Sequence, residues 1–146
     1  MSREYPARPI VGVGIVVLRP GPDVLLVRRG KAPDLGRWAL PGGAQDVGET
    51  AEAGARRELL EECGLTVGAL HLVTNVDSIR HDADGRVQYH YTILDFAGLW
   101  QGDVARHGDD VDAVEWAPVD GLAPYGLWQE AHRVIALAVR QLGLRS

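Results

Sequence analysis

Three glutamates at helical spacing are the residues of this sequence best suited to chemistry. Glu58, Glu61 and Glu62 stand in a run rich in alanine and leucine, and an α-helix with 3.6 residues per turn places all three carboxylates on one face. Like charges at this spacing repel each other by roughly 0.2–0.5 kcal/mol per pair. A hard divalent cation such as Mg²⁺ or Mn²⁺, which takes carboxylate, carbonyl and water oxygens, would relieve that repulsion. The triplet therefore predicts either a metal site or, as for most charge runs, a solvated acidic face.

A longer pattern surrounds the triplet and favours the metal site. Five residues separate Gly43 from Glu49, and seven more separate Glu49 from Arg57-Glu58-Leu59. One residue then precedes Glu61-Glu62, and one more precedes Gly64-Leu65. This stretch resembles the signature box of the Nudix hydrolases, and every fixed position of the box is filled. Nine specified positions within 23 residues are far more specific than a lone glycine fingerprint.

The resemblance implies hydrolysis of a nucleoside diphosphate linked to another group, with water attacking a phosphorus atom and metal ions neutralising phosphoryl charge. It implies Mg²⁺ as the cofactor, with Mn²⁺ as an alternative, and it assigns the metal carboxylates to the glutamate triplet. The backbone carbonyl of Gly42 or Gly43 is a further expected ligand, because glycine lets the backbone approach an ion closely. Arg57 is expected to orient a glutamate through charge-assisted hydrogen bonds. A supporting role for Glu49 is implied by the resemblance only.

The catalytic base has two possible sources in this family, the box helix and a later loop. Glu58 and Glu61 represent the helix. The loop reads His-Gly-Asp-Asp-Val-Asp from position 107, and the resemblance favours Asp110, six residues before a tryptophan. Asp109 and Asp112 are close rivals, and an ordinary acidic turn is the alternative, since aspartate is also a turn former.

Substrate contacts are expected from two arginines and a tyrosine. Arg28 and Arg29 end a strand and point to opposite faces, so at most one of them faces inward. Arg29 and Arg37 are suited to phosphate or to the terminal group, with solvated surface as the alternative for each. Tyr89 and Tyr91 share one face of a strand, where a base could stack; packing within the hairpin is the alternative.

The neighbouring motifs resemble those of small ADP-ribose pyrophosphatases, which predicts cleavage of ADP-ribose to AMP and ribose 5-phosphate. The proline that such enzymes carry about sixteen residues beyond the box is His81 here. The alternative substrate is therefore a (deoxy)nucleoside triphosphate, as in MutT-like pyrophosphohydrolases. A non-catalytic module that senses nucleotides is an alternative of another class, but the complete set of box carboxylates favours an enzyme.

The elements that must position these residues follow from apolar periodicity and turn signals. Thr50 is a natural N-cap and Gly64 a C-terminal stop for a helix over Ala51–Cys63. We expect an amphipathic helix from Leu127 to Leu142 and strands at residues 10–18, 24–29, 37–40, 66–80, 87–96 and 111–116. In the strand over 66–80, the residues expected to share a face are Leu70, Leu72, Thr74 and Val76. We expect a loop over 30–36 with Pro33 and a polar loop over 98–110. This α/β pattern predicts a mixed β-sheet between helices, and the resemblance implies the Nudix fold, an α/β/α sandwich, as a single domain over residues 1–146.

Composition and net charge exclude several classes of protein. The 146 residues are 46% hydrophobic and 24% charged, which is ordinary for a globular protein and excludes long disordered and membrane-spanning chains. A net charge of −5 argues against a general nucleic-acid binder but is compatible with a small nucleotide bound through metal and local arginines. Cys63 is the only cysteine and is expected to pack in the core. With no signal-peptide pattern at the N-terminus, we expect a cytoplasmic protein. Small enzymes of this family often form homodimers, which makes a homodimer a further expectation.

Overall fold

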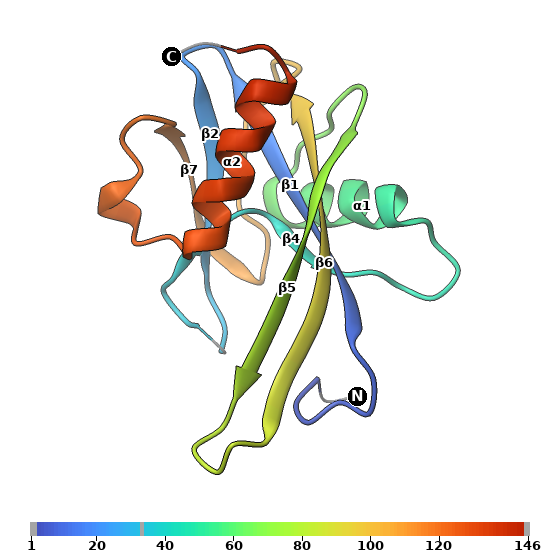
Figure 1. Cartoon of the computed structure of the whole chain (residues 1–146). Helices are drawn as coiled ribbons and strands as arrows, with labels where there is room; N and C mark the ends of the chain where they lie inside the picture. Colours follow the sequence, from blue (N-terminus) through green and yellow to red (C-terminus); the bar gives the residue numbers. More distant parts are fainter. Residues whose placement is uncertain (1–2, 33, 145–146) are drawn as a thin grey trace.

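The computed structural model describes residues 3–32 and 34–144, so the predicted loop residue Pro33 lies outside the described residues (Figure 1). The elements in chain order are β1 (Ile10–Arg19), β2 (Asp23–Arg29), β3 (Trp38–Ala39), β4 (Gly42–Ala44), α1 (Ala51–Cys63), β5 (His71–His81), β6 (Val87–Leu99), β7 (Val111–Pro118), the 3₁₀ helix η1 (Ala123–Tyr125) and α2 (Gln129–Gln141). No helix in the described part of the chain has the length and apolar character needed to cross a membrane.

One seven-stranded sheet organises these elements. Its order is β3-β2-β1-β6-β5, with β4 paired to β1 and β7 paired to β2. β1 and β6 run parallel, whereas the other pairs are antiparallel, so the sheet is mixed. The two helices α1 and α2 pack on opposite faces of the sheet (Figure 1). The predicted α/β/α sandwich with a mixed sheet is confirmed.

Alternation along β1 builds both halves of the core. Val13, Ile15 and Val17 pack against Leu59 and Cys63 of α1. The intervening side chains of β1 pack with α2 on the other face, as the cluster that contains Val16, Leu18, Val134 and Ile135 shows. Each fully buried aliphatic side chain of this kind stabilises the fold by roughly 1.5–3 kcal/mol. A central strand that is apolar on both faces therefore fixes the position of both helices.

Strand β1 has different hydrogen-bonded neighbours at its two ends. β1 pairs with β2 only at Leu18–Val24 and Arg19–Asp23. At its other end, from Gly12 to Gly14, its partner is β4 instead, which carries the first residues of the box. The divergence of β1 and β2 therefore brings the Gly42–Gly43 segment into the middle of the sheet.

Helix α1 has the predicted bounds, because its two ends are set by local signals. The Thr50 hydroxyl accepts a hydrogen bond from the Ala53 amide at 3.0 Å. At the other end, Gly64 adopts a left-handed conformation with φ of 67° and donates its amide to the Leu60 carbonyl. Such an N-cap is worth about 1 kcal/mol, and glycine is the residue that best tolerates this C-terminal conformation.

Several details differ from the sequence predictions. β5 begins at His71 rather than at residue 66, and β6 extends to Leu99, into the loop predicted over 98–110. The single face predicted for Leu70, Leu72, Thr74 and Val76 is wrong, because the pairing register shifts between Leu72 and Thr74. As a result Leu70 packs on the α1 side, Val76 is buried on the α2 side, and Leu72 is 55% exposed. β4 was not predicted, since glycine has no strand propensity. α2 begins at Gln129 rather than Leu127, although Leu127 is buried as expected.

Candidate active site

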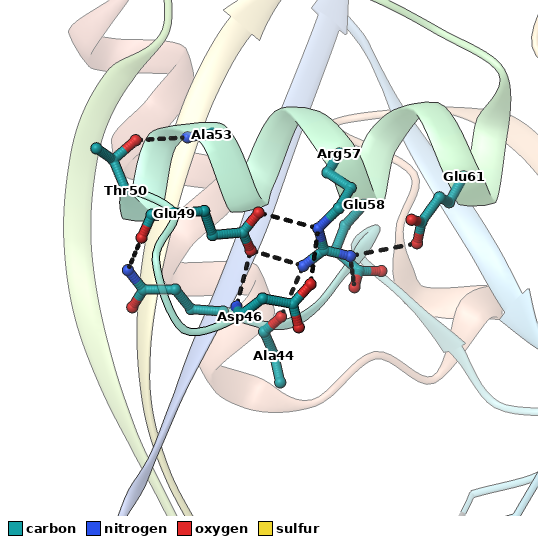
Figure 2. A network of polar contacts seen from close by, with 9 residues as sticks. Ala44, Asp46, Glu49, Thr50, Ala53, Arg57, Glu58 and Glu61 are labelled. Atoms are coloured by element: carbon teal, nitrogen blue, oxygen red, sulfur yellow. Dashed lines mark hydrogen bonds and ion pairs between the residues drawn. The ribbon is translucent and has the colours of Figure 1, made fainter.

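Arg57 ties the loop before α1 to the acidic face of the helix (Figure 2). Its guanidinium donates to the Glu49 carboxylate at 2.8 and 3.1 Å and to the Ala44 carbonyl at 2.9 Å. It also donates to Glu58 at 2.9 Å and to Glu61 at 3.3 Å. A planar guanidinium can satisfy several carboxylates at fixed angles, which a lysine cannot. Arg57 therefore contacts both the loop and Glu58, which are the contacts that its predicted orienting role requires.

Glu49 is the main anchor of Arg57. Hydrogen bonds from the Arg57 side chain and from the Asp46 amide lower the pKa of Glu49 to about 2. The Arg57 pKa is raised, first by its hydrogen bonds to Glu49 and also by those to Glu58. Both groups are thus kept in their charged forms, and their ion pair attaches the loop before α1 to the helix.

The carboxylates of Glu62 and Glu58 lie against the backbone of Gly42 and Gly43. The Gly42 amide donates to Glu62 Oε1 at 2.8 Å. A Cβ atom on Gly43 would lie 2.5 Å from the carboxyl carbon of Glu58, so only glycine leaves room for that carboxylate. The residues of the box that lie far apart in sequence therefore converge at this point.

The electrostatics of this point fit a divalent cation. The pKa of Glu62 is raised to about 7, chiefly by burial and also by the charges of Glu58 and Asp110, against the hydrogen bond from the Gly42 amide and the charge of Arg29. Burial also raises the pKa of Glu58, despite the contact with Arg57. Adjacent carboxylates that resist ionisation together become stable as anions when a hard cation lies between them.

The residues suited to hold that cation are Glu58, Glu62 and the carbonyl of Gly43. Glu61 is exposed and is turned toward Arg57, as Figure 2 shows. Within residues 3–32 and 34–144, no three His, Cys, Asp or Glu side chains converge closely enough to form a metal cluster. Backbone, water and substrate oxygens must then complete the coordination of a bound ion, as is usual for Mg²⁺.

The loop that carries Asp110 is attached to the C-terminal end of α1. The amides of Arg106 and Gly108 donate to the last carbonyls of the helix, those of Cys63 and Glu62, at 2.8 and 2.9 Å. The Asp110 carboxylate pairs with Lys31 at 2.6 Å and is 68% exposed. The charge of Asp110 contributes to the raised pKa of Glu62, so the predicted base lies near enough to the acidic face of α1 to interact with it electrostatically.

A cavity of about 550 Å³ opens beside Gly42 and Gly43. Its walls include the rings of Trp38, Tyr89, Tyr91 and Trp128, together with Arg29. The face-sharing of the two tyrosines is thus observed, and Arg29 lines the cavity while Arg28 pairs with Asp112 at 2.6 Å. The cavity is suited to a flat aromatic group attached to phosphates at the Gly42–Gly43 end.

Arg37 lies apart from the other predicted substrate residues. It is exposed, is absent from the described cavity walls, and donates to the Gly126 carbonyl at 3.5 Å. The short β3 strand that follows it turns Trp38, rather than Arg37, toward the cavity.

Sequence reasoning gave no role to several cavity residues, among them Asp95, Gly12 and Gly14. Asp95 is only 5% exposed, and it lines the cavity together with the two glycines. A signal was present in each case. Asp95 is the one charged residue in the apolar run Ile93-Leu-Asp-Phe-Ala97, and the glycines interrupt a β-branched strand at alternate positions.

Comparisons with known proteins agree with this geometry. A family model described as the NUDIX domain matches residues 8–138. The oxidized purine nucleoside triphosphate hydrolase of Danio rerio is 33% identical over 116 residues, which are 80% of this chain and 70% of that protein. The ADP-ribose pyrophosphatase of Methanocaldococcus jannaschii is 35% identical over 99 residues, 68% of this chain and 56% of that protein. The crystal structure of a MutT NUDIX hydrolase from Burkholderia pseudomallei has a TM-score of 0.77 at 30% identity and covers 89% of this chain and 98% of that one.

Proposed function

The chain belongs to the Nudix hydrolase family, whose members act on phosphoric anhydride bonds, and we propose that its substrate is a purine nucleoside triphosphate, cleaved to the monophosphate and pyrophosphate. The observation that carries this proposal is the aromatic cavity that opens onto the paired glutamates at Gly42 and Gly43. The relative with the longest similarity described above acts, by its name, on oxidised purine nucleoside triphosphates. This reverses the order of substrates expected from the sequence, in which ADP-ribose came first.

In this proposal each residue of the site has a definite task. Glu58, Glu62 and the Gly43 carbonyl hold a divalent cation, best Mg²⁺; when bound, this ion neutralises charge on the phosphoryl oxygens and activates water. Arg57 keeps Glu58 in position. Arg29 faces the phosphates from the cavity wall.

Asp110 is proposed as the general base. Water adds to a phosphorus atom, the bond from that atom to the bridging oxygen breaks, and pyrophosphate leaves. The Asp110 carboxylate accepts the proton that the attacking water loses. Its ion pair with Lys31 holds the carboxylate at the edge of the metal face.

ADP-ribose remains the second candidate substrate. It is favoured by the similarity to the archaeal ADP-ribose pyrophosphatase, of which this chain spans 56%. It is also favoured by the ion pair between Arg80 and Asp34 at the cavity wall, at 3.1 Å, which offers both hydrogen-bond donors and acceptors to a terminal ribose.

A substrate panel separates the candidates. Purified protein is incubated with dGTP, ATP, ADP-ribose and dinucleoside polyphosphates, with and without Mg²⁺, and the products are identified by chromatography. A nucleoside monophosphate and pyrophosphate from a purine triphosphate as best substrate would support the proposal. AMP and ribose 5-phosphate from ADP-ribose as best substrate would replace it, and no metal-dependent turnover at all would favour a sensing module.

Two expectations about the protein as a whole stay predictions. The first is a homodimer, which multi-angle light scattering of the purified protein would test. The second is residence in the cytoplasm, which fractionation of the source cells would test. Neither is needed for the chemistry proposed above.

A further inference from the structure

Asp95 is a buried carboxylate to which the proposed reaction gives no role. It lies near the middle of β6, between the buried or half-buried apolar residues Leu94 and Phe96, and it is only 5% exposed. An ionised carboxylate at such a place is costly unless it is paired. Its retention in the strand therefore needs an explanation.

Among the described residues, 3–32 and 34–144, none is a hydrogen-bond or ion-pair partner of this carboxylate. None of the described residues donates a hydrogen bond to Asp95, and only the more distant charges of Arg133 and Glu130 act on it. Arg133, the one cation among these, donates instead to Glu130 and to the Asn75 carbonyl. Asp95 is thus not half of an internal ion pair.

The oxygens of Asp95 reach the cavity. In the described part of the chain, no fully enclosed side-chain oxygen or nitrogen lacks a partner, and Asp95 lines the cavity wall. A Cβ on Gly14 would overlap with Asp95 Oδ1, so the absence of a side chain at Gly14 is what leaves space for the carboxylate. The carboxylate is therefore built into the wall that a ligand would meet.

The surroundings of Asp95 are those of a binding site for a flat ring. Tyr89, Tyr91 and Ile93 precede it on the same face of β6 and line the same cavity, as does Trp38. Aromatic side chains stack on nucleobases of any kind, so they bind a base without identifying it. The buried carboxylate of Asp95 is a polar group in this wall that can read the edge of the base.

We propose that Asp95 selects the base of the substrate by accepting two hydrogen bonds from a guanine-type edge, the ring N1–H and the exocyclic amino group. This inference rests on the proposed function, since it names the base of the nucleotide that the cavity takes. The two oxygens of a carboxylate match two parallel donors, as they do in bidentate contacts with arginine.

Guanine is the common base whose edge fits this acceptor best. Adenine presents a single amino donor beside a ring acceptor, which a carboxylate repels, and cytosine does the same. Oxidation of guanine at C8 leaves the N1–H and amino edge unchanged, so the contact serves guanine and its oxidised form alike. Burial raises the pKa of Asp95 to about 6, and the group is therefore ionised and able to accept both bonds at pH 8.

The test compares the binding of GMP and IMP, which differ only in the exocyclic amino group. Affinities are measured by isothermal titration calorimetry at pH 8 with Mg²⁺, so that the result does not depend on turnover. We expect GMP to bind on the order of tenfold more tightly than IMP, from the loss of one of two paired hydrogen bonds. In Asp95→Asn, which keeps the shape but offers one acceptor and no charge, this ratio falls toward one. Asp77→Asn, which removes a charge from an exposed position on β5 outside the described cavity wall, keeps the ratio.

Several results would overturn the inference. These are equal binding of GMP and IMP by the unchanged protein, a ratio that survives in Asp95→Asn, or no binding of either nucleotide. A ribose diol also presents two donors, so dGMP is included. If Asp95→Asn abolishes a preference for GMP over dGMP instead, the carboxylate reads the sugar and the base assignment is wrong. If the GMP preference depends on Asp95 but no triphosphate is hydrolysed, the inference stands and the proposed reaction fails.

Discussion

Replacing Asp95 with asparagine measures how much the ionised, buried carboxylate lowers the free energy of unfolding. Burial raises the pKa of Asp95 from its ordinary value of 3.8 to about 6 in the folded protein. The folded chain thus holds this proton more tightly than the unfolded chain. The resulting stability is fully present below about pH 4 and is lost as the pH rises through about 6.

The magnitude follows from the two pKa values. Each tenfold difference in proton affinity is worth about 1.4 kcal/mol, so the ionised carboxylate destabilises the fold by about 3 kcal/mol at pH 8. At pH 4.5 the folded chain keeps the Asp95 carboxyl protonated while the unfolded chain ionises most of it, and the same linkage gives a destabilisation of only about 1 kcal/mol. Asparagine has nearly the same shape and cannot ionise. Asp95→Asn should therefore be the more stable protein, by a margin that grows with pH.

Urea unfolding followed by tryptophan fluorescence at pH 4.5 and pH 8 measures this margin. Asp77→Asn, which alters an exposed carboxylate on β5, is the matched control and should change the unfolding free energy by less than about 0.5 kcal/mol at both pH values. A margin for Asp95→Asn that does not change with pH, or a variant less stable than the parent at pH 8, would refute the reasoning. Either result would mean that the carboxylate is already paired in the folded protein.

Three further substitutions test the catalytic assignments. Glu62→Gln should lower kcat by orders of magnitude in the presence of Mg²⁺ while circular dichroism shows an intact fold, because a neutral amide cannot replace a metal carboxylate. Asp110→Asn should lower kcat more than Asp109→Asn does, on the order of 10²-fold or more for a general base. Arg57→Lys should lower kcat on the order of 10- to 100-fold, since lysine cannot hold Glu49 and Glu58 together, whereas Arg56→Lys on the same helix should leave kcat within about twofold.

Each of these expectations has a contrary result. An active Glu62→Gln enzyme would remove Glu62 from the metal site. Equal and mild effects at Asp109 and Asp110 would return the base to the box helix, with Glu58 or Glu61 in that role. A similar loss in Arg56→Lys and Arg57→Lys would mean that kcat follows helix stability rather than the orientation of Glu58, because Arg56 binds the Val67 and Gly68 carbonyls and not the acidic face.

The parts of the fold that sequence predicts well are those set by local chemistry. Helix α1 starts at a threonine cap and stops at a left-handed glycine, and both signals lie within a few residues of the helix ends. The convergence of Arg57 on Glu49 and Glu58 also follows from spacing along one helix and the loop before it. In such cases the interacting residues are close in sequence, so their spacing along the chain is enough to predict that they meet.

The parts that sequence does not predict depend on partners distant in the chain. The register shift in β5 arises from its pairing with β6 and cannot be read from the alternation of β5 alone. β4 exists because Gly42 and Gly43 fit against β1, not because glycine favours strands. Asp95 is only one polar residue in an apolar strand until the fold places Gly14, eighty-one positions earlier, beside it on β1.

The limited pairing of β1 with β2 has a mechanical consequence. β1 and β2 pair directly at Leu18–Val24 and Arg19–Asp23, so the ladder that contains β6 and the ladder that contains β7 are hydrogen-bonded to each other at one end of the sheet. The cavity wall takes Arg29 from one ladder and Asp95 from the other. A nucleotide that contacts both residues would bridge the two ladders away from their direct pairing. We therefore expect bound substrate to stiffen the sheet at that end until hydrolysis releases it.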